Sequence, residues 1–264
     1  MSSFMSKVAD LLRAISGKSK KPPKTAAIIL AAGSSARMGG EIPKQLIELE
    51  GLPVVIHSLL AFERSSYISK IVLVVPEGDE SYYKSLAKQH GIKKLSAVTA
   101  GGMTRHQSST LGFKKVDDDM KFVAIHDAAR CLVTPEMIDR VCAAAIRYNA
   151  ATAATRSTDT VKISEKNKFI ERTEERHHVW LAQTPQVFNA DLYRAASYIA
   201  ESSHIQPTDD NSLVENVHHK VRLVECGRLN IKLTTPDDLL VAAAVLRARA
   251  ENGVEELPDD SDEE

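Results

Sequence analysis

A short apolar run that ends in a glycine- and serine-rich loop constrains this chain more than any other feature. Residues 26–32 read AAIILAA, and residues 33–45 continue as GSSARMGGEIPKQ. A run this short and apolar is typical of a strand buried on both faces of a parallel sheet. Because open α/β sheets bind ligands where their strands end, the loop after this run is a candidate site.

Short apolar runs and amphipathic helical patterns alternate along the rest of the chain. Further strands are expected at 70–76, 121–127, 150–156 and 221–227, and helices at 53–63, 79–90, about 105–115, 134–150 and 234–250. Such alternation is typical of a parallel sheet with helices on both faces. We therefore predict an α/β fold with a mainly parallel sheet. The chain has 264 residues, and α/β chains of this length commonly form a single domain.

The two ends of the chain differ in composition from the middle. Residues 1–24 form a basic amphipathic extension, expected to be a surface helix or arm, with docking to a membrane surface or a partner as the alternative. Residues 251–264 are dominated by acids and predict a solvated tail. The folded domain is therefore expected at 25–250.

One internal segment breaks the α/β rhythm. Residues 156–183 alternate apolar and charged side chains around a polar SEKNK turn, which predicts an extended hairpin in place of a crossover helix. The pattern fits a projecting β-arm and an edge hairpin lying on the domain about equally well.

Charge and cysteine content exclude several classes of protein. Lys and Arg total 34 against 35 for Asp and Glu, so no basic field points to nucleic acid as a partner. The three cysteines are widely spaced and odd in number, which fits neither a disulfide framework nor a zinc site and favours a reducing cytoplasm. No apolar run approaches the roughly 18 residues that a membrane span needs.

The first loop combines small residues with two cations. It is neither a Walker A loop nor a G-x-G-x-x-G dinucleotide fingerprint. Ala31, Ala32 and Gly33 let backbone N–H groups approach an anion, and Arg37 and Lys44 supply positive charge nearby. The loop therefore predicts a polyphosphate site, although a tight strand-to-helix turn with two surface cations explains it nearly as well.

Three later segments add groups that suit the same site. Asp127 ends a strand, where it could hold a divalent ion, and Arg130 follows it. GGMTRHQSS (101–109) offers a second glycine turn with the hydroxyl of Ser108, and Lys232 ends another predicted strand. Each group alone is ordinary, but together they predict one site. The histidines show no metal-ligand spacing, so we interpret them as structural or solvated.

At this point the sequence resembles a known family. The segments LAAGSSARMGGEIPKQ, GGMTRHQSS, HDAAR, WLAQTPQVF, TDDNSLVE and NIKLTTPDDL are similar, in order and spacing, to those of 2-C-methyl-D-erythritol 4-phosphate cytidylyltransferases of the non-mevalonate isoprenoid pathway. The resemblance covers about residues 25–247. It implies a Rossmann-like nucleotidyltransferase fold, CTP and Mg²⁺ as co-reactants, and a homodimer with exchanged arms.

The resemblance also implies roles for single residues. It places CTP on Ala31, Ala32, Gly33, Gly102 and Ser108, and it gives transition-state stabilisation to Arg37 and Lys44. Asp127 matches the acid at the metal and ribose end of the nucleotide. The positions that match the handling of the methylerythritol phosphate are Arg130, Thr160, Arg176 and Lys232, and in the family the arm carries Thr160 and Arg176 into the partner's site.

Two departures and three alternatives accompany the resemblance. Cys131 stands where the family usually has Pro after HDAAR, and Ser109 stands where an apolar residue is expected. The nearest alternative is a cytidylyltransferase acting on ribitol 5-phosphate or another polyol phosphate. A non-catalytic CTP-binding protein is a second alternative, and a nicotinamide dehydrogenase is remote because the dinucleotide fingerprint is missing.

Overall fold

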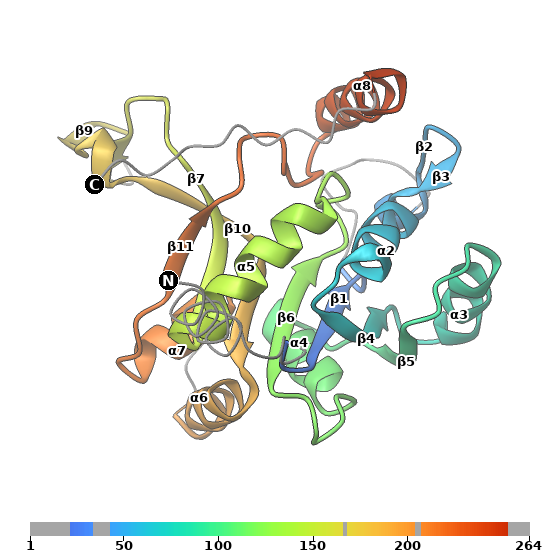
Figure 1. Ribbon diagram of the computed structural model, residues 1–264. Coiled ribbons are helices and arrows are strands. Elements are labelled where there is room, and N and C mark those ends of the chain that lie inside the picture. The colour runs from blue at the N-terminus through green and yellow to red at the C-terminus, as the bar shows by residue number, and fades with distance from the viewer. Residues whose placement is uncertain (1–21, 34–42, 166–167, 204–206, 253–264) are drawn as a thin grey trace, which may run out of the picture.

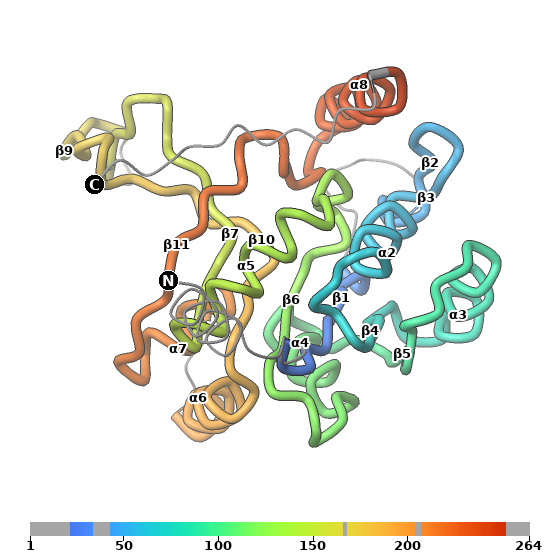
Figure 2. The backbone as a smooth tube through the Cα atoms, viewed as in Figure 1, coloured from blue at the N-terminus to red at the C-terminus, as the bar shows by residue number. Residues whose placement is uncertain are grey.

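The computed structural model describes residues 22–33, 43–165, 168–203 and 207–252 (Figures 1 and 2). The strands are β1 (Thr25–Leu30), β2 (Glu48–Leu49), β3 (Leu52–Pro53), β4 (Ile68–Val75), β5 (Leu95–Ala100), β6 (Phe122–Asp127), β7 (Ala150–Arg156), β8 (Lys162–Ser164), β9 (Ile170–Thr173), β10 (Trp180–Asn189) and β11 (Arg222–Glu225). The α-helices are α2 (Val54–Arg64), α3 (Glu80–Gln89), α4 (Arg105–Phe113), α5 (Pro135–Tyr148), α6 (Ala190–Ser202), α7 (Asp210–Asn216) and α8 (Pro236–Asn252), and two short 3-10 turns are η2 (Lys44–Leu46) and η3 (Arg176–His178).

A mainly parallel sheet forms the centre of the described structure. Its strand order is β11-β7-β10-β6-β1-β4-β5. The pairs β1 with β4, β1 with β6, β4 with β5 and β11 with β7 are parallel, whereas β10 runs antiparallel to β6 and β7. The predicted sheet is therefore confirmed, with one reversed strand that the sequence pattern did not indicate.

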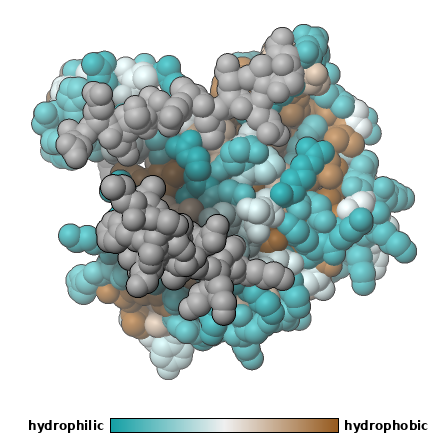
Figure 3. All heavy atoms as spheres, in the orientation of Figure 1, coloured by the Kyte–Doolittle hydropathy of each residue, from teal (hydrophilic) through white to brown (hydrophobic). Residues whose placement is uncertain are grey.

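Helices cover both faces of this sheet, as predicted. Ile29 and Leu73 belong to a core cluster that includes residues of α2, α3 and α5. Ile28 and Val74 belong to a second cluster on the other face, with residues of α4, α6 and α7. Because neighbouring residues of β1 enter different clusters, this strand is buried on both sides, which explains its uninterrupted apolar sequence. In Figure 3, most of the coloured atoms on the visible face belong to hydrophilic residues.

The predicted helix start at Thr134 is confirmed. Its hydroxyl accepts a hydrogen bond from the Met137 N–H, and Pro135 occupies the first turn of α5. Thr104 caps α4 in a reciprocal capping box with Gln107. These caps satisfy backbone donors that have no partner within the helix, so they fix where each helix begins.

The segment at 156–183 contains the predicted hairpin. β8 and β9 form a separate antiparallel pair. Figure 1 shows this pair projecting beyond the β7 and β10 end of the sheet. Ile170 of β9 and Phe169, which directly precedes it, are largely exposed. The geometry favours an arm over a hairpin lying on the domain.

The predictions about the chain ends fall largely outside the described residues. This applies to residues 1–21 of the basic extension and to residues 253–264 of the acidic tail. The extent of the domain and of both tails therefore stays a prediction. Among the described residues, no helix has the length and apolar character needed to cross a membrane.

Candidate active site at the switch point of the sheet

The carboxyl ends of β1 and β6 meet where the strand order reverses. Leu30 at the end of β1 is the register partner of Asp127 at the end of β6. From β1 the chain continues toward β4 on one side, while β6 lies on the other side. Crevices at such switch points hold the ligands of open α/β sheets. The fold therefore brings the first loop and Asp127 to the expected place.

The small residues of the first loop touch the glycine loop at residues 101–104, which precedes α4. Ala31 is buried, Ala32 is partly exposed and Gly33 is exposed. The Gln45 side chain donates a hydrogen bond of 2.8 Å to the Gly33 carbonyl. A Cβ atom on Gly101 would lie 2.4 Å from the Cβ of Ala32, so only glycine lets the two loops approach this closely. The predicted nucleotide positions at 31–33 and 102 are therefore neighbours.

The glycine loop is held in shape by the hydroxyl group of Ser108, which lies in the following helix α4. The Gly102 N–H donates to Ser108 Oγ at 3.1 Å, and this hydroxyl donates to the Thr104 carbonyl at 3.0 Å. Ser108 is almost fully buried. Its hydroxyl thus holds the loop that the resemblance places beside cytosine.

Asp127 lies between two cations. Arg105 Nε donates to one carboxylate oxygen at 3.0 Å, and Lys232 Nζ donates to the other at 2.6 Å. Burial alone would raise the pKa of Asp127, but the charges and hydrogen bonds of Arg105 and Lys232 outweigh it and hold the pKa well below its usual value. Asp127 is therefore an anion at any pH where a phosphoryl transfer enzyme operates.

Arg105 was not among the predicted site residues. Its Nη1 also contacts Asp210 Oδ2 at 2.5 Å, and the other oxygen of Asp210 accepts a bond of 2.8 Å from the Tyr193 hydroxyl. The Asp210 N–H donates to Gln186 Oε1 at 3.0 Å. Burial opposes the charge on Arg105, but Asp210 and Asp127 together raise its pKa above the usual value. The only sequence signal was its position in the GGMTRHQSS segment.

Two further predicted cations reach the segment that carries Lys232. Lys44, which is 9% exposed, has its Nζ 3.3 Å from the Leu233 carbonyl. Arg130 Nη1 donates to the Asn230 carbonyl at 2.7 Å, and burial lowers the pKa of Arg130. Both cations therefore lie near the residues flanking Lys232. Arg37 lies outside the described residues.

The TPQ and NIK segments support the end of β6. Thr184 Oγ1 accepts a bond of 3.1 Å from the Asp127 N–H and lies 3.0 Å from His126 Nδ1. Asn230 donates to the Gln183 side chain and to the Thr184 carbonyl, both at 2.9 Å. His126 is fully buried, and burial lowers its pKa to about 3. This histidine is structural, as expected, because it stays neutral above acid pH.

Thr160 and Arg176 lie apart from this group of side chains. Both are exposed on the arm segment, and Arg176 Nη1 contacts the Thr158 carbonyl at 3.4 Å. Within the described part of one chain, neither has a hydrogen bond or ion pair to the Asp127 group, which consists of Asp127 and its partners Arg105 and Lys232. The structure thus brings together the other described site residues, and it leaves these two on the projecting hairpin.

Cys131, which departs from the family pattern, is a buried thiol. It is 3% exposed, and burial raises its pKa to about 12. Because the thiolate is the reactive form, this cysteine is poorly suited to act as a nucleophile.

The residues at the switch point fit a substrate-borne Mg²⁺ better than a protein cage for a metal. Among the described residues, no three His, Cys, Asp or Glu side chains gather as a ligand set. Mg²⁺ commonly binds one or two carboxylates together with substrate phosphates and water. Asp127 fits this mode if the partly exposed Lys232 releases one carboxylate oxygen.

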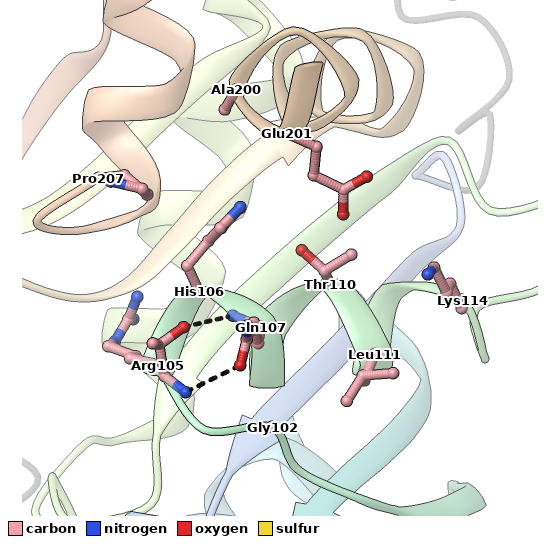
Figure 4. Close-up of a pocket in the computed structure, with 11 residues that line it drawn as sticks. Gly102, Arg105, His106, Gln107, Thr110, Leu111, Lys114, Ala200, Glu201 and Pro207 are labelled. Carbon is pink, nitrogen blue, oxygen red and sulfur yellow. Dashed lines mark hydrogen bonds between the residues drawn. The ribbon is translucent and has the colours of Figure 1, made fainter. Parts of the chain in front are cut away.

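A pocket of about 800 Å³ lies beside the site, between α4 and α6 (Figure 4). It shares Gly102, Thr104 and Arg105 with the residues described above, and its other walls come mainly from α4 and α6. The start of α4 therefore contributes residues both to the switch-point site and to this pocket.

Comparison with known proteins identifies what the chain resembles. The family model described as 2-C-methyl-D-erythritol 4-phosphate cytidylyltransferase matches residues 25–248. A protein of that name from Pelotomaculum thermopropionicum is 43% identical over 227 residues, which cover 86% of this chain and 95% of the relative. Another from Alkaliphilus oremlandii is 39% identical over 229 residues, covering 86% and 97%.

Solved structures agree with these relatives. The 4-diphosphocytidyl-2C-methyl-D-erythritol synthase of Anaerococcus prevotii superposes with a TM-score of 0.76 at 32% identity, over 86% of this chain and 97% of that chain. The 2-C-methyl-D-erythritol 4-phosphate cytidylyltransferase of Thermus thermophilus gives a TM-score of 0.70 at 29% identity, over 85% and 99%. The fold is therefore similar over 85–86% of this chain and over nearly the whole of each of these two solved structures.

Proposed function

Because the chain belongs to the 2-C-methyl-D-erythritol 4-phosphate cytidylyltransferase family, we propose that its switch-point site transfers the cytidylyl group of CTP to 2-C-methyl-D-erythritol 4-phosphate. Membership of this family makes the chain a nucleotidyltransferase of isoprenoid biosynthesis. The products of the reaction are CDP-methylerythritol and pyrophosphate.

One observation carries the assignment of this site. Four segments that are distant in the sequence converge beside Asp127: the loop after β1, the glycine loop before α4, the end of β6 and the segment carrying Lys232. They are four of the six segments in which the sequence resembles the family. Their convergence supports one binding site for a polyphosphate and an acceptor phosphate.

The proposed chemistry needs aligned charge and no covalent enzyme intermediate. An oxygen of the acceptor phosphate attacks the α-phosphorus of CTP, and the bond from that phosphorus to the pyrophosphate oxygen breaks. The backbone at Ala31–Gly33 would hold CTP, while Arg37 and Lys44 would stabilise the negative charge that moves onto the leaving pyrophosphate. Lys232 and Arg130 would hold the acceptor phosphate, with Gly102 and Ser108 beside the base.

Mg²⁺ is part of the proposal. Asp127 would hold it, and the ion would neutralise charge on the CTP phosphates. Lys232, whose side chain is 37% exposed, could move from Asp127 to the acceptor phosphate when CTP binds. The ion pair places the Lys232 ammonium group beside the carboxylate that would hold the ion, and the flexible four-carbon stem of lysine would let it reach a second anion nearby.

A homodimer with exchanged arms completes the proposal. Thr160 and Arg176 lie on the projecting hairpin, away from the Asp127 group of their own chain. A partner's arm would bring both to the acceptor phosphate. A cytoplasmic location, expected from the cysteine pattern, belongs to the same proposal.

Pyrophosphate release tests the activity. The protein is incubated with CTP, Mg²⁺ and one of several polyol phosphates, and EDTA is added in a parallel series. We expect fastest turnover with 2-C-methyl-D-erythritol 4-phosphate and none with EDTA. Faster turnover with ribitol 5-phosphate would refute the acceptor, and activity that survives EDTA would refute the metal.

Subunit mixing tests the arm. Lys44→Ala and Arg176→Ala should each inactivate a symmetric dimer, but a mixed dimer with crossed arms has one site carrying both defects and one carrying none. Random exchange should therefore restore about a quarter of the parental activity. No recovery, despite exchange proven by mass, would show that Arg176 serves its own subunit.

A further inference from the structure

Arg105 joins two carboxylates that come from distant parts of the chain. It is the first residue of α4, and Figure 4 shows it beside His106 and Gln107. Its Nε contacts Asp127 at the end of β6, and its Nη1 contacts Asp210 at the start of α7. A single side chain thus connects the glycine loop, the central sheet and the start of α7.

The two carboxylates differ in how firmly they are held. Asp210 is 1% exposed, and its Oδ1 accepts from the Tyr193 hydroxyl while its N–H donates to Gln186. The Asp127 side chain is 11% exposed, and its second partner is the more exposed Lys232. Asp210 is therefore the more firmly held end of the Asp127–Arg105–Asp210 chain, and Asp127 is the end that the proposed function assigns to the nucleotide.

Arginine suits this position for a geometric reason. Its planar fork donates from separate nitrogens at fixed angles, so it can bond two carboxylates at once and hold them at a set spacing. Lysine would carry the same charge on one compact ammonium group and could not reproduce this spacing. The distances of 3.0 Å to Asp127 and 2.5 Å to Asp210 are both those of direct contacts.

We propose that Arg105 is a positioning residue that fixes the Asp127 carboxylate relative to the glycine loop at 101–104. It would keep this carboxylate in place when Lys232 moves to the acceptor phosphate. This inference rests on the proposed function of the site. Arg105 begins the helix whose capped start also carries Ser108, so a shift of Arg105 moves the glycine loop and Asp127 relative to each other. The affinity for CTP and the increase in that affinity caused by Mg²⁺ should therefore both depend on Arg105.

The first test compares Arg105→Lys with the parent. Calorimetric titration of CTP without acceptor, once with Mg²⁺ and once with EDTA, measures the site independently of turnover. We expect the gain in CTP affinity from Mg²⁺ to fall about 10- to 100-fold in the variant, as for other residues that orient a metal-binding carboxylate. With acceptor present, kcat should fall within the same range.

Arg194→Lys is the matched control. Arg194 forms an exposed ion pair with Asp191 on α6, outside the site, so its replacement should leave CTP binding and kcat unchanged. If Arg105→Lys also keeps the parental Mg²⁺ effect and kcat, then charge alone is enough and the positioning role is refuted. A parent that binds CTP with Mg²⁺ but never turns over would refute the proposed function, and the titration would still test Arg105.

A second variant covers the case in which Arg105→Lys does not fold. Asp210→Asn leaves Arg105 and Asp127 in place and removes the charge that anchors the far end of the arginine. We expect a native circular dichroism spectrum with a reduced Mg²⁺ effect on CTP binding. A folded Asp210→Asn protein with the parental Mg²⁺ effect would overturn the inference.

Discussion

Replacing His126 with Asn should make the protein less sensitive to acid. The ring is fully buried, packs at 4.9 Å from the Phe62 ring, and its Nδ1 lies 3.0 Å from the Thr184 hydroxyl. Its Nε2 has no hydrogen-bond partner among the described residues. The folded protein therefore holds this histidine neutral, and protonation is strongly disfavoured there.

The size of the effect follows from two pKa values. Burial lowers the pKa of His126 from 6.5 to about 3. Because the unfolded chain binds this proton more tightly, the stability supplied by the neutral ring is complete above pH 6.5 and falls with pH until the folded pKa is reached. Each pH unit in this window costs about 1.4 kcal/mol, so lowering the pH from 7 to 5 should cost about 2 kcal/mol through His126 alone.

Urea unfolding at pH 7 and pH 5, at one protein concentration, measures this loss. The His126→Asn variant keeps an acceptor for Thr184 but cannot gain a proton, so it should lose about 2 kcal/mol less than the parent between the two pH values. Asn fills less space, so only the pH dependence is compared. His178→Asn replaces an exposed ring and serves as the control for the His-to-Asn exchange itself. Equal pH dependence of the parent and His126→Asn would refute the reasoning.

Three other predictions concern catalysis and the chain ends. Lys44→Ala should lower kcat on the order of 100- to 1000-fold with a smaller effect on CTP affinity, because the lysine meets charge that develops in the transition state; steady-state kinetics with an unchanged kcat would remove it from the mechanism. Asp127→Asn should raise the Mg²⁺ concentration for half-maximal rate, and a Mg²⁺ titration that superposes on the parent's would contradict the metal role. Deleting residues 1–22 and 253–264 together should leave turnover intact, and a folded truncated protein that has lost most of its activity would show that an end contributes to the site.

The central strands could be predicted because each is marked by a short apolar run, which is a local feature of the sequence. β1, β4, β6 and β7 are short apolar runs, and each was expected within two residues of where it lies. β10 was missed because Gln183, Thr184 and Gln186 interrupt its apolar pattern, although all three are buried. Their polar groups are satisfied by Asn230, Asp210 and other residues far along the chain, and no local pattern contains those partners.

The site residues show the same limit. Asp127 was predicted because it ends β6, and Lys232 was predicted because it was expected to end another strand in a segment that resembles the family. The strand at Lys232 was wrong, because that residue lies in the irregular segment between β11 and α8, but the two side chains contact each other as a shared site requires. Arg105 was missed because an arginine in the first turn of a helix is usually a surface residue. Its importance comes from Asp210, which lies 105 positions away in the sequence.

The fate of oxygen in the acceptor phosphate tests the central proposal most directly. The acceptor, 2-C-methyl-D-erythritol 4-phosphate, is labelled with ¹⁸O at its three terminal phosphate oxygens. It is incubated with unlabelled CTP, Mg²⁺ and the protein, and the masses of the products are measured by mass spectrometry. Attack of the acceptor phosphate on the α-phosphorus of CTP predicts CDP-methylerythritol that keeps all three labels and pyrophosphate that contains none. Labelled pyrophosphate, or pyrophosphate released without a labelled CDP product, would contradict cytidylyl transfer at this site.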